Sequence, residues 1–293
     1  MAKVLIIGAG PAGISAALYA RRGGAEVTVV TKGIGTGGLA KAEKIENYYG
    51  LAEPVTGLEL EQRGIDGALR LGVELIEDEL LELSFNDTFT GFKAATKQHQ
   101  LAADSVILAA GASRKSLRIP GIAEFEGKGV SYCAICDAFF YRGKTVAVIG
   151  SGEYALHEAQ TLLPHAAQVI LLTNGMESEV AVPAAIEVRT EKLAAVEGDG
   201  RVERVRFEDG TELDLAGVFL AIGTAGSTEF ARKIGAMLDG NSIKVDEHMA
   251  TNVPGLFAAG DCTGGLLQVA KAVYQGAEAG LSAVRYIRSK QAE

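Results

Sequence analysis

Two glycine-rich turns constrain the fold of this 293-residue chain more than any other feature of its sequence. The first turn, with the pattern G-x-G-x-x-G over residues 8–13, follows an apolar run at 4–7 and precedes an alanine-rich helical segment at 14–22. A second strand is predicted at 26–30, so the turn lies in the strand–turn–helix–strand setting that dinucleotide binding requires. Glycine lets the backbone approach a pyrophosphate there, and the helix dipole stabilises its negative charge.

The second turn repeats this arrangement with the pattern G-x-G-x-x-A over residues 150–155. A strand is predicted before it at 144–149, a helix at 153–163 and another strand at 169–173. Two such units predict an α/β protein with two Rossmann-like domains of the FAD- or NAD(P)-binding type. Further strands are expected at 73–76, 80–85, 89–95, 105–110, 186–190, 202–207 and 218–222, and further helices at 58–71 and 268–286.

Cys133 and Cys136 form the pattern C-x-x-C, and Asp137 follows the second cysteine directly. This spacing brings two sulfur atoms onto one helical turn, and beside a βαβ unit it is typical of a redox-active dithiol. Asp137 is expected to hold or supply the proton that thiol–disulfide exchange moves. The alternatives are half of a zinc site, for which no second ligand pair stands at a suitable spacing, and a purely structural disulfide. The third cysteine, Cys262, is expected to be a small buried packing residue.

The overall composition disfavours nucleic-acid and membrane partners. The net charge is −9 at pH 7, which opposes binding to phosphate backbones. No apolar run is long enough to cross a bilayer, and the N-terminal residues lead directly into the first strand. We therefore expect a cytoplasmic protein.

Other residues follow predicted strands at places where a dinucleotide is bound. An acidic residue is expected at the end of the second strand to hold a ribose, but Thr31 and Lys32 stand there instead. Gly111 ends another buried strand. Gly260 and Asp261 end a later one, where a carboxylate can accept hydrogen bonds from ribityl or ribose hydroxyls.

The two glycine turns, the C-x-x-C with Asp137 and the Gly-Asp pair at 260–261 together resemble the low-molecular-weight thioredoxin reductases. Their order and spacing match over nearly the whole chain. The resemblance implies an FAD-binding domain made of residues 1–113 and 244–293. It also implies a homodimer, and a pyridine-nucleotide-type domain of residues 114–243 that is inserted into the first domain and carries the C-x-x-C. A basic segment at 114–121 is expected to be a hinge between the domains.

The resemblance also implies roles for individual residues. Cys136 would face the flavin and take up its electrons, and Cys133 would attack the disulfide of thioredoxin or a similar small protein, with Asp137 as the acid. Leu39 stands where the family usually has a glutamine in its flavin-covering loop. The residues expected to contact FAD are Gly8, Gly10, Pro11, Ala12, Gly13, Thr31, Lys32, Gly37, Gly38, Leu39, Asn47, Gly111, Gly260, Asp261, Gln268, Val269 and Ala270.

The inserted domain departs from the family pattern at the place where NADPH is bound. Members that use NADPH carry a His-Arg-Arg type cluster after the second strand of this domain, followed by a helix that bears arginine. Here residues 173–175 replace the cluster, Glu177 and Glu179 follow, and Pro183 interrupts the segment, so that no helix is expected before the strand at 186–190. Carboxylates repel a 2′-phosphate where arginine would form charge-assisted hydrogen bonds.

The chain is therefore most similar to the branch of the family that takes electrons from reduced ferredoxin or a deazaflavin. Tyr132 and residues 137–141 around the dithiol also match that branch. The expected function is FAD-dependent reduction of thioredoxin, with ferredoxin as the electron donor. The alternatives are an NAD(P)H-dependent thioredoxin reductase, a flavin-dependent dithiol oxidase that makes disulfides with oxygen, and a non-enzymatic flavoprotein redox sensor.

Overall fold

The chain folds into two compact units in a computed structural model that describes residues 2–111, 119–222 and 226–292. The first unit combines Met1–Ser113 with Gly226–Glu293, and the second unit is Arg114–Ala225. Most of the basic segment that the sequence analysis placed between the domains, residues 114–118, lies outside the described residues.

Residues 226–243 belong to the first unit, although the sequence analysis assigned them to the inserted domain. They include helix α5 (Ser227–Lys233), which contacts strand β4 (Leu80–Phe85) of that unit. The first unit is therefore built from two stretches of sequence, of which the first has the expected bounds and the second begins 18 residues earlier than expected.

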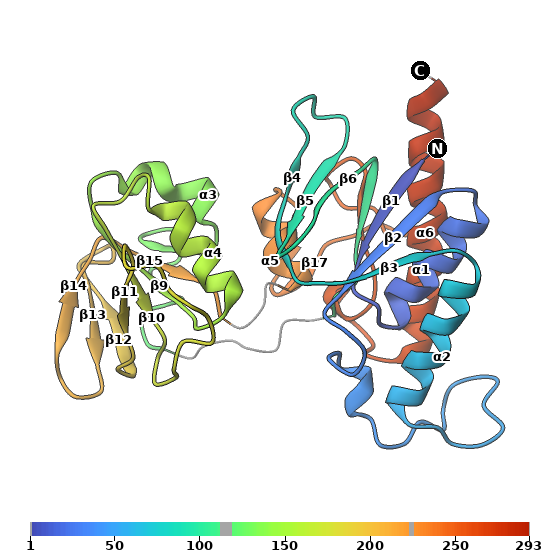
Figure 1. The fold of residues 1–293 in the computed structure, drawn as a ribbon, viewed down its shortest axis with the longest axis horizontal. Helices are drawn as coiled ribbons and strands as arrows, with labels where there is room; N and C mark the ends of the chain where they lie inside the picture. Colours follow the sequence, from blue (N-terminus) through green and yellow to red (C-terminus); the bar gives the residue numbers. More distant parts are fainter. Residues whose placement is uncertain (1, 112–118, 223–225, 293) are drawn as a thin grey trace. The chain divides into compact units, whose positions relative to one another are not determined.

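A five-stranded parallel sheet forms the centre of the first unit (Figure 1). Valine and isoleucine dominate its two central strands, as expected where a parallel sheet is buried on both faces. The strand order is β18 (Leu256–Ala258), β7 (Ser105–Leu108), β1 (Lys3–Ile7), β2 (Glu26–Thr31) and β3 (Glu74–Glu77).

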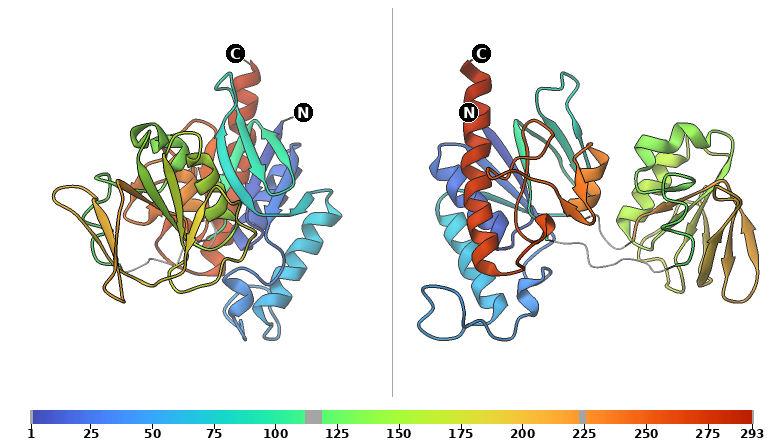
Figure 2. Two further views of the ribbon diagram at one scale, coloured as in Figure 1. Left: turned by 60° about the vertical axis from the view of Figure 1, so that its left-hand side comes forward. Right: turned by 180° about the vertical axis from the view of Figure 1, so that it is seen from behind.

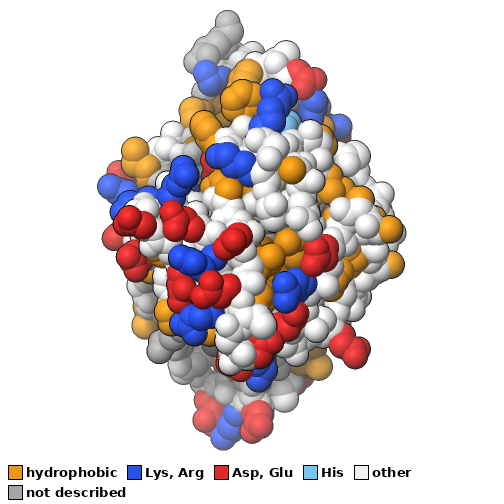
Figure 3. Space-filling view, turned by 90° about the vertical axis from the view of Figure 1, so that its left-hand side faces the viewer, with side chains coloured by type: hydrophobic (Ala, Val, Ile, Leu, Met, Phe, Trp, Pro, Cys, Tyr) orange, Lys and Arg blue, Asp and Glu red, His pale blue; other side chains and the backbone are white. Residues whose placement is uncertain are grey.

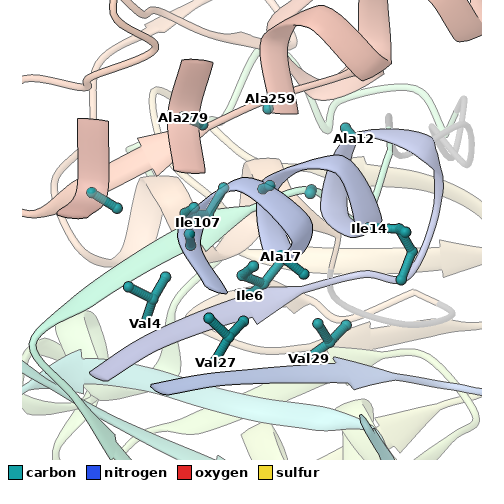
Figure 4. Packing of buried hydrophobic residues seen from close by; sticks show 14 of the residues in the cluster. Val4, Ile6, Ala12, Ile14, Ala17, Val27, Val29, Ile107, Ala259 and Ala279 are labelled. Atoms are coloured by element: carbon teal, nitrogen blue, oxygen red, sulfur yellow. The ribbon is translucent and has the colours of Figure 1, made fainter. Parts of the chain in front are cut away.

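Three helices pack beside this sheet: α1 (Pro11–Arg22), α2 (Gly57–Arg70) and α6 (Val269–Ala292). Pro11 occupies the first position of α1, where its fixed φ suits a helix start. The right view in Figure 2 shows α1 and α6 side by side, and their facing residues are mostly alanine and glycine, which permit close approach. Figure 4 shows strand side chains that point toward α1 and α6, among them Val4, Ile6, Val27, Val29 and Ile107. On the helices they meet small residues such as Ala12, Ala17 and Ala279.

A smaller antiparallel sheet connects β3 to β7 and consists of β4, β5 (Phe92–Thr96) and β6 (Gln100–Ala103). The strand expected at 89–95 begins later, because the residues before it form the β4–β5 turn. In that turn Asn86 accepts a hydrogen bond from the backbone N–H of Thr90 at 3.0 Å, and Phe89 has a φ of 56°. A two-stranded sheet of β16 (Leu238–Asp239) and β17 (Ser242–Ile243) completes the unit.

The second unit repeats the parallel arrangement and adds an antiparallel sheet. Helix α4 (Glu153–Leu162) follows its glycine turn, and α3 (Ala134–Asp137) with the 3₁₀ helix η2 (Ala138–Tyr141) follows its edge strand. The parallel order is β11 (Glu187–Arg189), β10 (Gln168–Leu172), β9 (Thr145–Ile149), β15 (Gly217–Leu220) and β8 (Val130–Ser131), and the antiparallel order is β12 (Leu193–Glu197), β13 (Arg204–Phe207) and β14 (Glu212–Asp214).

The segment between β10 and β11 contains turns and no helix, as the sequence predicted. Asn174 and Gly175 have φ values of 52° and 83°, and the Asn174 side chain accepts a hydrogen bond from the backbone N–H of Leu193 at 2.8 Å. This turn is therefore tied to β12. Across the described ranges, no helix combines the length and the apolar character needed to cross a membrane.

Candidate functional site

Cys133 lies just before helix α3, Cys136 lies within it, and the two form a disulfide. Cys133 is the N-cap of α3, and its sulfur accepts a hydrogen bond from the backbone N–H of Cys136 at 3.2 Å. Cys133 is buried, with 6% of its surface exposed, whereas Cys136 is exposed. Because the two sulfurs are bonded to each other, they do not form half of a zinc site here. Nor do three His, Cys, Asp or Glu side chains gather as metal ligands in the described part of the chain.

Asp137 is connected to the backbone of Cys133 through Ser131. The Ser131 hydroxyl donates to Oδ2 of Asp137 at 2.6 Å, and its oxygen accepts from the N–H of Cys133 at 3.1 Å. Tyr141 packs nearby, and the pKa of its phenol is raised, first by burial and then by the negative charge of Asp137. The sequence-predicted acid therefore lies beside the dithiol.

A second carboxylate supports the same turn from α4. Glu158 is 2% exposed, and its Oε2 accepts a hydrogen bond from the backbone N–H of Ala134 at 2.8 Å. The N–H groups of two successive residues, Cys133 and Ala134, are thus each held by a polar side chain. Since the two holding groups come from different elements, the turn is fixed from both sides.

Apolar side chains next to the disulfide face solvent. Ile135, Phe139 and Phe140 are 59%, 66% and 68% exposed, respectively. Basic residues lie close by: the Arg142 guanidinium lies over the Phe139 ring, and the Lys144 ammonium donates to the backbone carbonyl of Phe140. Exposed large apolar side chains that gather beside a reactive group are typical of a protein-binding surface.

The first glycine turn has the geometry of an anion-binding loop. A Cβ on Gly13 would lie 1.8 Å from the Gly8 carbonyl oxygen, so only glycine permits this close turn. Gly10 caps α1 without any side-chain hydrogen bond, and the first turn of the helix contains no acidic residue. A Cβ on Gly10 would meet no atom within 4 Å, so the backbone there is open to a ligand. Pyrophosphate fits such a helix start.

Residues from the end of the chain lie against this turn. Gly260 has a φ of 85°, and a Cβ there would lie 2.8 Å from the Cβ of Ala12. The fold therefore brings the loop that carries Asp261 to the start of α1. Lys271 holds the loop, since its ammonium donates to the carbonyls of Gly260 and Gly264 at 2.8 and 2.6 Å.

The flavin-covering loop expected around residue 37 also reaches the last segment. Asn47 donates to the Gln268 side chain at 3.1 Å, which joins two predicted contact residues that are 221 positions apart. Gly37 and Gly38 lead into the 3₁₀ helix η1 (Leu39–Lys41). Val269 and Ala270 open α6.

Thr31 and Lys32, at the end of β2, have other partners in this structure. Thr31 is buried, and its hydroxyl accepts from the N–H of Gly33 at 3.4 Å. The Lys32 ammonium lies 3.8 Å from a carboxylate oxygen of Glu79. Gly111 lies beyond the end of β7 and has a φ of 72°. The role of each in binding a cofactor stays a prediction.

A carboxylate from a later segment is hydrogen-bonded to the second glycine turn, in the second unit. The Ser151 hydroxyl donates to the Glu179 side chain at 3.0 Å, and the Glu179 N–H donates to the Ser151 carbonyl at 2.9 Å. Glu179 therefore lies on the loop whose pattern is that of a nucleotide phosphate site.

Three residues near these sites carried no signal in the sequence. Ser131, Glu158 and Lys271 belong to no motif, and their contacts depend on how separate elements pack. Cys262, by contrast, is the buried residue that the sequence predicted. Its sulfur lies 3.3 Å from the Ala259 carbonyl oxygen, and burial raises the pKa of its thiol to about 11.

Residues 2–276 match the sequence profile of the family described as pyridine nucleotide-disulphide oxidoreductase. A thioredoxin reductase of Aquifex aeolicus is 33% identical over 312 residues, which cover 98% of this chain and 94% of that protein. The structure is similar to that of the atypical thioredoxin reductase TRi from Desulfovibrio vulgaris Hildenborough, with a TM-score of 0.92 and 40% identity over 99% of both chains. It is also similar to a ferredoxin-flavin thioredoxin reductase from Clostridium acetobutylicum, with a TM-score of 0.75 and 30% identity over 98% of both chains.

Proposed function

This chain belongs to the pyridine nucleotide-disulphide oxidoreductase family, and from that premise we propose that it reduces thioredoxin or a similar small protein with electrons from ferredoxin rather than NADPH. Its relatives are thioredoxin reductases, so the chain is an FAD-dependent, thioredoxin-reductase-like oxidoreductase that acts on sulfur groups. The observation that carries the proposal is the Cys133–Cys136 disulfide in a unit whose nucleotide turn holds the Glu179 carboxylate.

The first unit fits FAD. The open turn at Gly10 and the acid-free start of α1 suit its pyrophosphate. Asp261, which Lys271 and the close approach of Gly260 to Ala12 hold beside that turn, suits a ribityl or ribose hydroxyl. When bound, FAD would act as a two-electron carrier that can reduce a disulfide.

The dithiol turn suits exchange with a protein disulfide. In the reduced state, the N–H of Cys136 stabilises negative charge on the Cys133 sulfur, which makes Cys133 our choice for the attacking thiolate. Cys133 attacks one sulfur of the partner disulfide and releases the other as a thiolate, which takes a proton from Asp137, the acid of this reaction. Cys136 then attacks the Cys133 sulfur, so that the partner gains two electrons and the Cys133–Cys136 disulfide reforms.

Glu179 supports a donor other than NADPH. A phosphate bound on the second glycine turn would lie close to this carboxylate. Two unit charges about 4 Å apart near a protein surface repel by on the order of 4 kcal/mol. The segment that follows β10 offers no compensating arginine among residues 173–188.

Arg189, at the end of β11, is already engaged. Its guanidinium donates to Glu191 at 2.6 and 3.1 Å and lies over the Phe207 ring. The β12–β14 face of the second unit likewise pairs its basic residues with acids, as in Arg206 with Glu197 at 2.8 Å, and Figure 3 shows both signs of charge interspersed there. An acidic ferredoxin therefore gains little attraction from this face, and we place its docking on the first unit, where FAD binds.

We also propose that the protein is a homodimer in the cytoplasm. Large apolar side chains on α6 face solvent, among them Tyr274 and Leu281, which lie seven residues apart and so on one side of the helix. Tyr19 on the neighbouring α1 is exposed as well. A second copy of the chain would cover these side chains, and light scattering would show a particle of twice the chain mass.

Cysteine variants test the exchange step. With oxidised thioredoxin, we expect C136S to form a stable mixed disulfide through Cys133, because the resolving thiol is absent. We expect C133S to trap none, and neither variant to turn over. C262A, which changes a buried packing residue, serves as the control and should keep full turnover.

Three results would bear against this proposal. Trapping by C133S through the exposed Cys136 would exchange the roles of the two cysteines. If neither variant captures thioredoxin, and the reduced wild-type protein leaves it oxidised, thioredoxin is not the substrate. Rapid oxygen uptake in the presence of dithiols would instead favour the dithiol oxidase.

A further inference from the structure

We propose that Ser131 is a positioning residue that orients the Asp137 carboxylate for the exchange reaction at Cys133. The inference rests on the proposed function, because Asp137 and Cys133 take their roles from it. It adds a residue for which no motif gives a role, and it depends only on contacts within the second unit.

Ser131 is 5% exposed and ends strand β8, so its backbone is fixed by the sheet. A hydroxyl has one proton to donate. That proton faces Oδ2 of Asp137 at 2.6 Å, while the Cys133 carbonyl lies at 3.5 Å, which is too long to compete. The hydroxyl oxygen meanwhile accepts from the N–H of Cys133 at 3.1 Å. One side chain thus connects the acid to the residue that bears the attacking sulfur.

The connection restricts the acid, because a short hydrogen bond to a carboxylate fixes the direction of both its oxygens. Oδ2 is held by Ser131, which leaves Oδ1 as the oxygen that can carry the transferable proton. In the exchange step the Cys133 thiol passes its proton to Asp137 as its sulfur attacks. A bond forms between Cys133 and the partner, the partner disulfide breaks, and Asp137 gives that proton to the departing thiolate.

Other groups around the turn do not replace Ser131. Tyr141, on η2, lies near Asp137. Burial and that carboxylate raise the pKa of Tyr141, so its side chain stays a neutral phenol. Glu158 on α4 holds the N–H of Ala134 and is occupied there. Removing the Ser131 hydroxyl therefore frees the Asp137 carboxylate and the N–H of Cys133, whereas Glu158 still holds the N–H of Ala134.

A double-mutant cycle tests the coupling. Wild type, S131A, D137N and S131A/D137N are reduced with dithiothreitol, freed of reductant under argon and mixed with oxidised thioredoxin in a single turnover. This design requires no electron donor. We expect D137N to slow partner reduction about a hundredfold and S131A about tenfold, because a general acid contributes about 10²–10⁴ and S131A only misaligns it. In the D137N background, S131A should cause no further slowing.

Two control variants show whether the slowing in S131A comes from loss of the Ser131 hydroxyl. S131T retains the hydroxyl and should restore most of the wild-type rate. S178A removes a serine hydroxyl whose hydrogen bonds are local, to the carbonyl and the N–H of Val180, and should react like wild type. Far-ultraviolet circular dichroism during heating checks that every variant is folded.

Each outcome decides the matter. Equal slowing by S131A in both backgrounds would mean that Ser131 merely supports the N–H of Cys133, and the inference would be wrong. The inference would also be wrong if S131A reacted as fast as wild type, or as fast as S131T. If D137N itself reacts at the wild-type rate, Asp137 is not the acid, and that part of the proposed function fails first.

Discussion

Replacing Asp78 with asparagine should destabilise the first unit in a pH-dependent way. Asp78 lies between β3 and β4, and its side chain is buried. Oδ2 accepts from Thr96 at 2.5 Å, from the N–H of Gln98 at 3.0 Å and from His99 at 2.9 Å, while Oδ1 accepts from the N–H of Glu79 at 2.8 Å. This carboxylate therefore ties the end of the parallel sheet to the β5–β6 turn.

The size of the effect follows from the pKa of this group. Burial alone would raise the pKa of Asp78, but the hydrogen bonds outweigh it and lower the pKa from 3.8 to about 2. A difference of that size contributes about 2.5 kcal/mol to the free energy of unfolding. Because the folded-state pKa is the lower one, the contribution is complete above the unfolded pKa and disappears as the pH falls from about 4 to about 2.

Urea unfolding of wild type and D78N across this range is the assay. At neutral pH the variant should lose about 2–3 kcal/mol, since its amide presents N–H groups to donors, and the difference should shrink as Asp78 becomes protonated in the wild type. D87N is the matched control, because Asp87 is 89% exposed and only pairs with Lys93. An equal loss of stability at neutral pH and at about pH 3 would refute the charge-based explanation.

Two further predictions concern the cofactor turn and the third cysteine. Gly10→Ala should leave the unfolding of the FAD-free protein unchanged, because its Cβ meets no atom within 4 Å, yet weaken FAD binding at least about tenfold by filling the space of the pyrophosphate. Fluorescence titration measures this, and Gly67→Ala, whose Cβ also meets nothing within 4 Å, should bind FAD normally. Iodoacetamide at about pH 8 should alkylate Cys133 and Cys136 of the reduced native protein but spare Cys262, whose thiol pKa burial raises to about 11. Equal labelling of all three cysteines, measured by mass spectrometry, would contradict the burial of Cys262.

Local patterns predicted the main elements because they depend on short-range chain geometry. The apolar run before Gly8 and the alanines after Pro11 identified β1 and α1, and the same logic found β9 and α4. The short acidic segment and Pro183 correctly predicted that β10 and β11 are joined without a helix. The start of β5 was placed too early, because the turn at Asn86 depends on a side-chain hydrogen bond and not on composition.

The site was predictable only in part, since its remaining contacts arise from packing. The sequence indicated Cys133, Cys136 and Asp137 as neighbours, but not that Ser131 joins two of them. It also indicated acidic residues after β10, but not that Glu179 returns 28 positions to hydrogen-bond Ser151. Such contacts depend on where a loop folds back, which the spacing of apolar residues in the sequence does not predict.

The electron donor is the central claim, and anaerobic reduction of the bound flavin tests it most directly. Flavin absorbance is followed in a stopped-flow instrument after mixing the protein with reduced ferredoxin, with NADPH or with NADH. With Glu179 on the nucleotide turn and Arg189 engaged by Glu191, we expect ferredoxin to reduce the flavin, and neither pyridine nucleotide at micromolar concentration to do so. Reduction by NADPH within seconds would contradict this account and would identify an NADPH-dependent thioredoxin reductase.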